Sequence, residues 1–321
     1  MIERGRSSIN ASSLPQWAHV QLVQSTTGGV RSRLSRAAAA LVRRGLINWR
    51  DPPIHYQFEG TTLLLPLSHE LPYYRSRFPD YSRNVGRIAA RLHAKRGNSL
   101  MIIDVGANVG DTLAIIRSQV PSPVLCIEPH PAFAKLLREN AKRLGPAVIE
   151  QTLLGHSSET VPPLTSALGT ASIGKNDKKA GLTTEPLPSV LARHPPFEQA
   201  RLVKIDADGY DGEILRGAAR WLEHQKPVLF FEHDPHLEEM VTGRSTAPLD
   251  LLAEWGYQYI SVFSNEGNHV VSSESLEASF LREILHYFSG RQERRYCDIA
   301  AYAENDGDVW ADVRDAELRR A

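Results

Sequence analysis

From residue 100 onward, short apolar runs alternate with segments whose apolar residues recur at the helical spacing of three and four positions. The apolar runs occupy residues 100–105, 123–128, 147–154, 201–206, 227–232, 257–263 and 296–302. The helical segments between them occupy residues 110–119, 131–144, 211–224 and 247–255. Four of the runs are almost wholly apolar, which is typical of central parallel strands covered on both faces. The alternation predicts an open, mostly parallel α/β sheet with helices on both faces and right-handed crossovers.

The N-terminal part of the chain follows a different pattern. Residues 31–47 predict a basic amphipathic helix that ends near Gly45. Its apolar face is mostly alanine, so we expect it to pack on the main domain rather than lie on a membrane. Residues 55–67 hold two apolar runs around a Glu-Gly pair, which indicates a hairpin, and residues 81–95 predict another helix. We therefore divide the chain into a basic extension with helix, hairpin and lid-like segment, a main domain, and a charged, solvated C-terminal tail (1–98, 99–303 and 304–321).

Composition is that of an ordinary globular protein, with 42% hydrophobic residues, 23% charged residues and a net charge of zero. Residues 1–99 nevertheless hold 15 Lys and Arg against 5 Asp and Glu, and the remainder has a matching acidic excess. A neutral chain gives no reason to expect a nucleic-acid partner. The chain opens without a secretory apolar segment, and its longest run of small apolar residues is too short for stable membrane insertion. Its two cysteines, Cys126 and Cys297, lie in apolar stretches, so we expect a cytoplasmic protein with buried reduced thiols.

The most informative segment is residues 102–112, IIDVGANVGDT, where a buried strand runs into a glycine turn and then a helix. Gly106 permits the tight turn, and we expect Gly110 to let the helix approach a ligand closely. Backbone amides at such a turn favour acceptor atoms. The dinucleotide pattern G-x-G-x-x-G would need glycine where this chain has Asn108 and Asp111. A carboxylate there suits a cationic or hydroxylated ligand better than a pyrophosphate, and the phosphate loop G-x-x-x-x-G-K-[ST] is absent.

Two further acids are associated with this loop. Glu128 ends the second predicted strand, at the place where a carboxylate accepts hydrogen bonds from ribose hydroxyls. Nicotinamide dinucleotides and S-adenosylmethionine both contain ribose, so Glu128 by itself does not separate them. Asp104 precedes the turn and is placed to brace the loop or to meet an ammonium group indirectly. We expect an apolar wall for an adenine ring near residues 152–156, from Leu153 or Leu154.

Four blocks in this order, IDVGANVGDT, CIEPHP, LVKIDADGYDGEILRGA and PVLFFEHDP, resemble the FkbM family of S-adenosylmethionine-dependent methyltransferases. The resemblance covers roughly residues 67–302. It implies the class I methyltransferase (Rossmann-like) fold, a seven-stranded, mostly parallel sheet with one antiparallel strand, and methylation of hydroxyl groups on sugars and related natural products. One departure is Asp208, where the common form of the block has glutamate. The predicted cofactor-binding residues are Asp104, Gly106, Ala107, Asn108, Gly110, Asp111, Thr112, Glu128, Pro129, Leu154 and Asp206.

Candidate catalytic residues follow the fourth and fifth predicted strands. Ligands of open α/β sheets bind at the carboxyl ends of the strands, and strand alternation places Lys204 and Asp206 on one face. Asp206 is our first choice for a base or a metal ligand, and Lys204 for steering or neutralising charge. Glu232 and His233 end the neighbouring strand, and His233 is a candidate base because histidine ordinarily titrates near neutrality.

A divalent cation is a further alternative, because carboxylate oxygens are the ligands that Mg²⁺ prefers. The oxygens would come from Asp206, Asp208 and Glu232, with Asp234 nearby. Zinc-type His and Cys spacing is absent, and we do not expect a metal to be required.

Aromatic and basic residues alternate in the predicted lid-like segment. Aromatic faces and guanidinium groups suit sugars that carry carboxylate or phosphate. The alternative is that these residues dock the N-terminal extension on the main domain. The residues concerned are Tyr73, Tyr74, Arg75, Arg77, Tyr81 and Arg83.

These observations favour an S-adenosylmethionine-dependent O-methyltransferase whose partner is a small-molecule or glycan acceptor. Because methyl transfer is an in-line displacement, the protein's main task would be positioning. Two other classes stay open: an NAD-dependent oxidoreductase on a related fold, and a non-catalytic nucleoside-binding module. A homodimer is also left open by the sequence.

Overall fold

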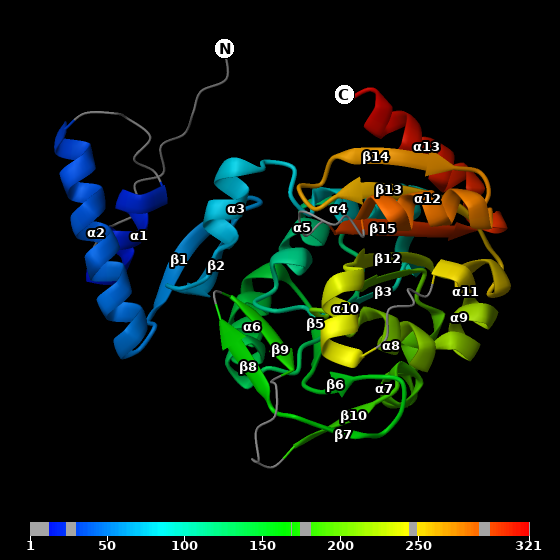
Figure 1. Ribbon diagram of the computed structural model, residues 1–321, viewed down its shortest axis with the longest axis horizontal. Helices are drawn as coiled ribbons and strands as arrows, with labels where there is room; N and C mark the ends of the chain where they lie inside the picture. The colour runs from blue at the N-terminus through cyan, green and yellow to red at the C-terminus, as the bar shows by residue number, and fades with distance from the viewer. Residues whose placement is uncertain are drawn as a thin grey trace.

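A computed structural model describes residues 13–23, 30–167, 169–173, 181–243, 249–288 and 296–320. Its centre is an eight-stranded sheet in the order β14-β13-β15-β12-β11-β3-β4-β5 (Figure 1). The strands, in chain order, are β3 (Ile102–Val105), β4 (Val124–Ile127), β5 (Ala147–Glu150), β11 (Leu202–Ile205), β12 (Val228–His233), β13 (Tyr257–Ser264), β14 (His269–Ser273) and β15 (Cys297–Ala303). Each of the seven predicted runs overlaps one of these strands, and β12, β13 and β15 extend one residue beyond theirs.

The sheet is parallel from β5 to β12, and β15 enters antiparallel between β12 and β13. This is the predicted class I methyltransferase arrangement with one correction. An additional strand, β14, pairs antiparallel with β13 at the edge, so eight strands replace the predicted seven. The sequence of β14, HVVSS, lacks the apolar run that marks the central strands; four of its residues are half-buried and Val270 is exposed.

Helices cover both faces of the sheet, as predicted, because alternate residues of each strand enter different cores. One core includes residues of α4 (Arg83–Arg96), α5 (Asp111–Gln119), α6 (Pro131–Leu144) and α13 (Gly307–Leu318). The other includes residues of α7 (Leu187–Arg193), α8 (Asp211–Gly217), α9 (Ala219–Gln225), α11 (Leu249–Glu254) and α12 (Ala278–Phe288). α10 (Pro235–Thr242) follows β12. The helix predicted over 211–224 is thus two consecutive helices, α8 and α9.

Short strands and turns connect the larger elements. β6 (Leu153–Leu154), β10 (Leu182–Glu185) and β7 (Thr160–Val161) form one small sheet, and β8 (Leu164–Ala167) pairs with β9 (Thr170–Ile173). Single 3₁₀ turns are η1 (Gly97–Ser99), η2 (Pro195–Gln199) and η3 (Glu304–Asp306).

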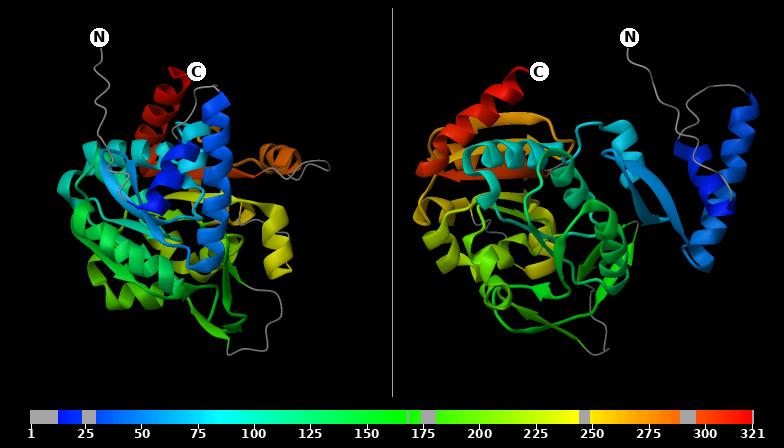
Figure 2. Two further views of the ribbon diagram at one scale, coloured as in Figure 1. Left: turned by 90° about the vertical axis from the view of Figure 1, so that its left-hand side faces the viewer. Right: turned by 180° about the vertical axis from the view of Figure 1, so that it is seen from behind.

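The N-terminal extension stands at the periphery of the molecule (Figure 2). It comprises α1 (Leu14–Val23), α2 (Val30–Trp49), β1 (Pro53–Phe58), β2 (Thr61–Pro66) and α3 (Leu71–Arg77). The predicted helix and hairpin are both present, but α2 continues past Gly45 to Trp49. The hairpin docks on α6, where the side-chain amide of Asn140 bonds both the N–H and the C=O of Leu64 at 2.8 and 3.0 Å. α2 packs mainly against α1, and its Leu46 and Ile47 also pack against the core cluster that the hairpin shares with the main domain.

Residues 304–320 are not the predicted solvated tail. They form η3 and α13, and α13 buries Val309, Trp310 and Val313 against α4 and the sheet. In the sequence, charged residues lie between these apolar positions, so an amphipathic helix with one buried face is not evident there. None of the described helices is long and apolar enough to cross a membrane.

Candidate functional site

A cavity of about 570 Å³ opens where β3, β4, β11 and β12 end. Strand ends of a parallel sheet meet at one edge, which explains why motifs far apart in sequence line one space. The predicted site residues that line it are Gly106, Asn108, Asp111, Thr112, Glu128, Pro129, Leu154, Lys204, Asp206, Asp208 and Glu232. Thr152 and Leu153 lie beside Leu154, where an adenine wall was predicted.

The glycine turn after β3 is shaped by close backbone contacts. Gly106 has φ +72°, and a Cβ there would lie 1.8 Å from the carbonyl oxygen of Asp206. The amides of Gly106 and Ala107 donate to the carbonyl of Ile127 at 3.0 and 3.1 Å, which ties the turn to β4. Ala107 is thereby buried and does not line the cavity. The predicted turn is therefore present, and only glycine fits at position 106.

Gly110 has a different role from the predicted one. It does not line the cavity; a Cβ there would meet the side chain of Leu137 at 2.9 Å. Its φ of +91° also favours glycine. Gly110 therefore permits close packing of α5 against α6 rather than close approach to a ligand.

Glu128 lies at the end of β4 with its carboxylate held by backbone amides. Oε2 accepts from the N–H of Asn108 at 2.8 Å and Oε1 from the N–H of His130 at 2.7 Å. Burial raises the pKa of Glu128 to about 7, although both hydrogen bonds favour the ionised form. A fixed acceptor that is ionised near neutrality is suited to bind ribose hydroxyls.

Lys204 connects the acids on either side of the glycine turn. Its Nζ lies 3.3 Å from Oδ1 of Asp104 and 3.6 Å from Oδ2 of Asp206, and donates to the carbonyls of Val105 and Gly106 at 3.2 and 3.1 Å. Burial alone would lower the pKa of Lys204, but the neighbouring carboxylates outweigh it and raise that pKa. Asp104 is fully buried beneath the turn, and burial raises its pKa to about 6. Lys204 and Asp104 therefore brace the loop from below.

The carboxyl groups of Asp206, Asp208 and Glu232 line the end of the cavity near β11 and β12, away from β4 and Glu128. Asp206 is half-exposed, and Asp208, at φ +47°, has a pKa that burial and the charge of Asp206 raise to about 7. Burial and the charge of Asp206 also raise the pKa of Glu232 well above its usual range. Within the described residues, no three His, Cys, Asp or Glu side chains are arranged to hold a metal ion, so the alternative set of Asp206, Asp208 and Glu232 gains no support.

Two further predicted residues are not brought to this cavity. His233 is buried beside a separate cavity of about 10 Å³, and burial lowers its pKa to about 4. Asp234 caps α10, where Oδ1 accepts from the N–H of Leu237 at 2.9 Å. His233 is the second of two adjacent strand residues, so strand alternation points it away from Glu232's side.

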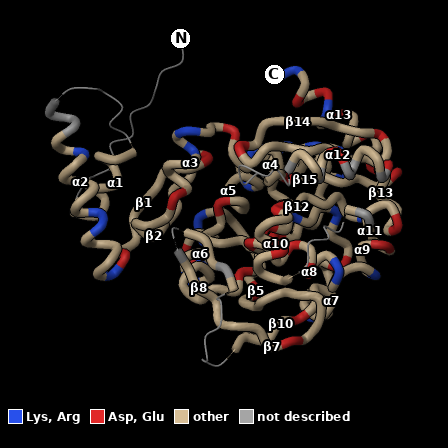
Figure 3. Tube along the Cα trace, in the orientation of Figure 1, with Lys and Arg blue, Asp and Glu red and all other residues tan. Residues whose placement is uncertain are grey.

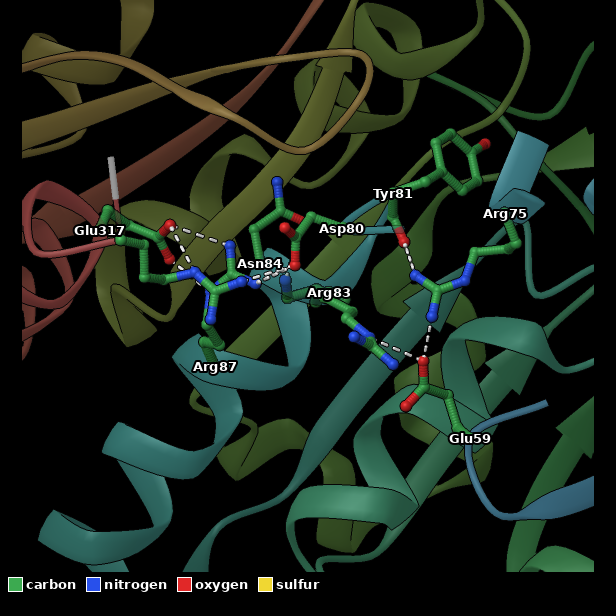
Figure 4. A network of polar contacts seen from close by, with 10 residues as sticks. Glu59, Arg75, Asp80, Tyr81, Arg83, Asn84, Arg87 and Glu317 are labelled. Atoms are coloured by element: carbon green, nitrogen blue, oxygen red, sulfur yellow. Dashed lines mark hydrogen bonds and ion pairs between the residues drawn. The ribbon is translucent and has the colours of Figure 1, made fainter. Parts of the chain in front are cut away.

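The predicted lid is present only in part. Tyr74 and Tyr81 line the cavity with ring centroids 5.4 Å apart. Arg75 and Arg83 instead pair with Glu59 of the β1–β2 turn, and Arg75 also donates to the carbonyl of Tyr81 at 2.9 Å (Figure 4).

The other two lid candidates are also engaged outside the cavity. Arg77 lies over the ring of Phe78, and Tyr73 under the guanidinium of Arg43. The arginines thus hold the tyrosines in place, and their positive charges do not face the cavity.

Several lining residues were not predicted. His69 accepts the N–H of Leu71 at Nδ1, so its neutral ring carries the proton on Nε2, 3.4 Å from Oδ1 of Asn108. The side-chain amide of Asn108 donates to the carbonyl of Gly169 at 2.6 Å, and Tyr296 lines the acidic end. His69 and Tyr296 lie outside the strand-end motifs. In the sequence they could be noticed only as polar residues within loops, which is a general signal.

Comparisons with known proteins agree with the family resemblance of the sequence motifs. Residues 104–259, just under half of the chain, match the family model described as "Methyltransferase FkbM domain". No curated protein matches at a significant level. Solved structures that resemble this one include the methyltransferase FkbM from Methylobacillus flagellatus KT (15% identity, 89% of this chain and 58% of that one, TM-score 0.38). Another is the O-methyltransferase from Bacillus cereus in complex with SAH (12% identity, 68% and 80%, TM-score 0.36).

Proposed function

Because residues 104–259 match the model of the methyltransferase FkbM domain, we propose that the protein is an S-adenosylmethionine-dependent O-methyltransferase. Its acceptor would be a hydroxyl of a sugar, a glycan or a glycosylated natural product. The observation that carries the proposal is the single cavity that joins the glycine turn, Glu128 and the carboxyls Asp206 and Glu232. S-Adenosylmethionine would supply the methyl group.

The cofactor half of the cavity fits an adenosine bearing a cationic group. The buried carboxylate of Glu128 would accept hydrogen bonds from the ribose hydroxyls. Thr152, Leu153 and Leu154 would form a wall for the adenine ring. Asp111 offers a carboxylate where a pyrophosphate would be repelled. This distribution favours the sulfonium cofactor over NAD.

At the other half, Asp206 is the proposed base. Its carboxylate is half-exposed in the cavity and would take the proton of the acceptor hydroxyl as that oxygen receives the methyl group. Lys204 acts as a positioning residue, because its ammonium group is held by two backbone carbonyls and two carboxylates. Glu232 and Asp208 would contact other hydroxyls of the acceptor.

The charge of the cavity narrows the acceptor class. Its described lining holds several carboxylates, while Lys204 is already paired and the lid arginines bind Glu59. Phosphate or carboxylate groups would therefore be repelled, which reverses the expectation that lid arginines recognise anionic sugars. The rings of Tyr74, Tyr81 and Tyr296 suit neutral or amine-bearing sugars.

Calorimetry with S-adenosylmethionine, its demethylated product and NAD tests the cofactor. We expect binding of the first two only, and binding of NAD alone would support an oxidoreductase instead. Transfer of a labelled methyl group to panels of neutral, amine-bearing and anionic sugars then tests the reaction. Asp206→Asn should lose transfer by about 10²–10⁴-fold; cofactor binding by the unmodified chain without transfer to any hydroxyl would favour a binding module.

A further inference from the structure

The outward face of α2 is apolar, although the helix lies at the edge of the molecule (Figure 1). Leu34, Leu41 and Trp49 are 68%, 74% and 71% exposed. They are seven and eight residues apart, so they follow one another along a single face of the helix. Ala39 and Arg43 lie on the inner side, where Ala39 is fully buried and Arg43 donates to the carbonyl of Leu67 at 3.2 Å. The helix therefore carries an apolar stripe toward solvent in addition to its inner apolar side, where Leu46 and Ile47 pack against the core.

The charged residues of α2 itself all have one sign. Residues 4–50 contain eight arginines and no aspartate or glutamate, and Figure 3 shows the basic segments on α2. Arg36, Arg44 and Arg50 are exposed, and the guanidinium of Arg50 lies 5.0 Å from the ring centroid of Trp49. A partner for this face must therefore offer negative charge together with an apolar layer.

We propose that α2 lies on the surface of an anionic lipid bilayer, with Leu34, Leu41 and Trp49 inserted among the lipids and the arginines at the headgroups. Trp and Arg are suited to this interface, because each combines an apolar body with a polar group. The described helices include none that could span the bilayer, so the contact is interfacial. The proposal rests on α2 alone and does not depend on the proposed methyltransferase activity.

A bilayer fits this surface better than a second copy of the chain does. Two-fold pairing of α2 with itself would bring arginines of both copies together with no carboxylate in the helix to balance them. Each basic residue near an anionic bilayer instead contributes favourably, and Leu and Trp insertion adds apolar burial.

Flotation of the full chain with vesicles tests the proposal. We expect it to bind phosphatidylcholine vesicles that contain one third phosphatidylglycerol, and to bind pure phosphatidylcholine at least about tenfold more weakly. High salt should weaken the binding, because it screens the arginines. Equal binding to both kinds of vesicle, or to neither, would overturn the proposal.

Variants separate the stripe from the rest of the surface. The double substitution Leu41→Glu with Trp49→Glu should reduce binding by more than about tenfold, and Arg36→Glu with Arg44→Glu should abolish the preference for anionic lipid. Leu318→Glu is the matched control, since Leu318 is 56% exposed on α13, and should bind as the unmodified chain does. Circular dichroism checks that each variant is folded. A dimer in light scattering that the stripe variant dissociates, without vesicle binding, would identify a second copy as the partner and refute the bilayer.

Discussion

The backbone N–H of Asn108 donates to Oε2 of Glu128 at 2.8 Å. This bond joins the turn after β3 to the end of β4, so the loop and the proposed ribose acceptor fix one another. The same carboxylate also accepts from His130, which leaves it little freedom to turn. A site built in this way is pre-organised, because its acceptor is already oriented before a ligand arrives.

Cofactor affinity should rise with pH through neutrality. Burial raises the pKa of Glu128 to about 7, so part of the population is protonated below that pH and must lose a proton to accept hydrogen bonds from ribose. We expect the affinity measured by calorimetry to increase from about pH 6 to about pH 8. In Glu128→Gln the affinity should fall by about 10-fold or more at the higher pH, with a flatter pH dependence. An unchanged slope in the variant would assign the titration to another carboxyl, such as Asp208.

Gly106→Ala should eliminate cofactor binding and destabilise the fold. The added Cβ would lie 1.8 Å from the Asp206 carbonyl, and the positive φ adds strain. We expect the free energy of unfolding to fall by more than about 2 kcal/mol in a urea titration. Gly243→Ala is the matched control: Gly243 also has positive φ, +70°, but nothing lies within 4 Å of the position that a Cβ would take. It should lose only about 1–2 kcal/mol and keep the cofactor site; equal losses in both variants would contradict the contact argument.

Lys204→Met should leave Asp104 as an unpaired carboxylate in a fully buried position. We expect a loss of about 3–5 kcal/mol in the free energy of unfolding at about pH 8. The sign of the pH dependence follows from Asp104: without its cation its folded pKa rises further, so the loss shrinks as pH falls and the carboxyl becomes protonated. The double variant Lys204→Met with Asp104→Asn should recover most of the stability. A single variant as stable as the unmodified chain would show that the pair does not support the loop.

Trp310→Ala tests the role of α13. Trp310 is buried, stacks on Tyr259 with centroids 4.9 Å apart, and donates from Nε1 to the carbonyl of Ile260 at 3.1 Å. Removal should reduce the free energy of unfolding by about 3–5 kcal/mol. Leu318→Ala, at an exposed position of the same helix, should change it by less than about 0.5 kcal/mol. Similar small effects for both would mean that α13 contributes little to the fold.

The sequence predicts the central strands and the glycine turn after β3 well because both depend on local patterns. Four-residue apolar strands such as β3 and β11 are buried on both faces, and a glycine turn at Gly106 needs a particular backbone conformation. Glu128 and Asp206 follow from their places at strand ends. Their roles in binding and transfer stay predictions.

The rest depends on contacts that no local pattern encodes. His69 and Tyr296 reach the cavity from segments outside the strand-end motifs, and Glu59 pairs with arginines of two later helices, α3 and α4. His233 shows the opposite effect: its residue type fits a base, but strand alternation and burial take it away from the cavity. Tertiary packing, rather than residue type, decides these cases.

The pairing of α4 with α13 has a consequence for biosynthesis. Arg87 of α4 bonds both carboxylate oxygens of Glu317, a residue 230 positions later in the chain (Figure 4). At a translation rate of about 5–20 residues per second, Arg87 emerges from the ribosome roughly 10 to 50 seconds before its partner. During that interval the surface of α4 that receives Val309, Trp310 and Val313 is uncovered. The nascent chain thus presents an apolar patch on α4 until α13 has been made, and a chaperone could bind α4 during that interval.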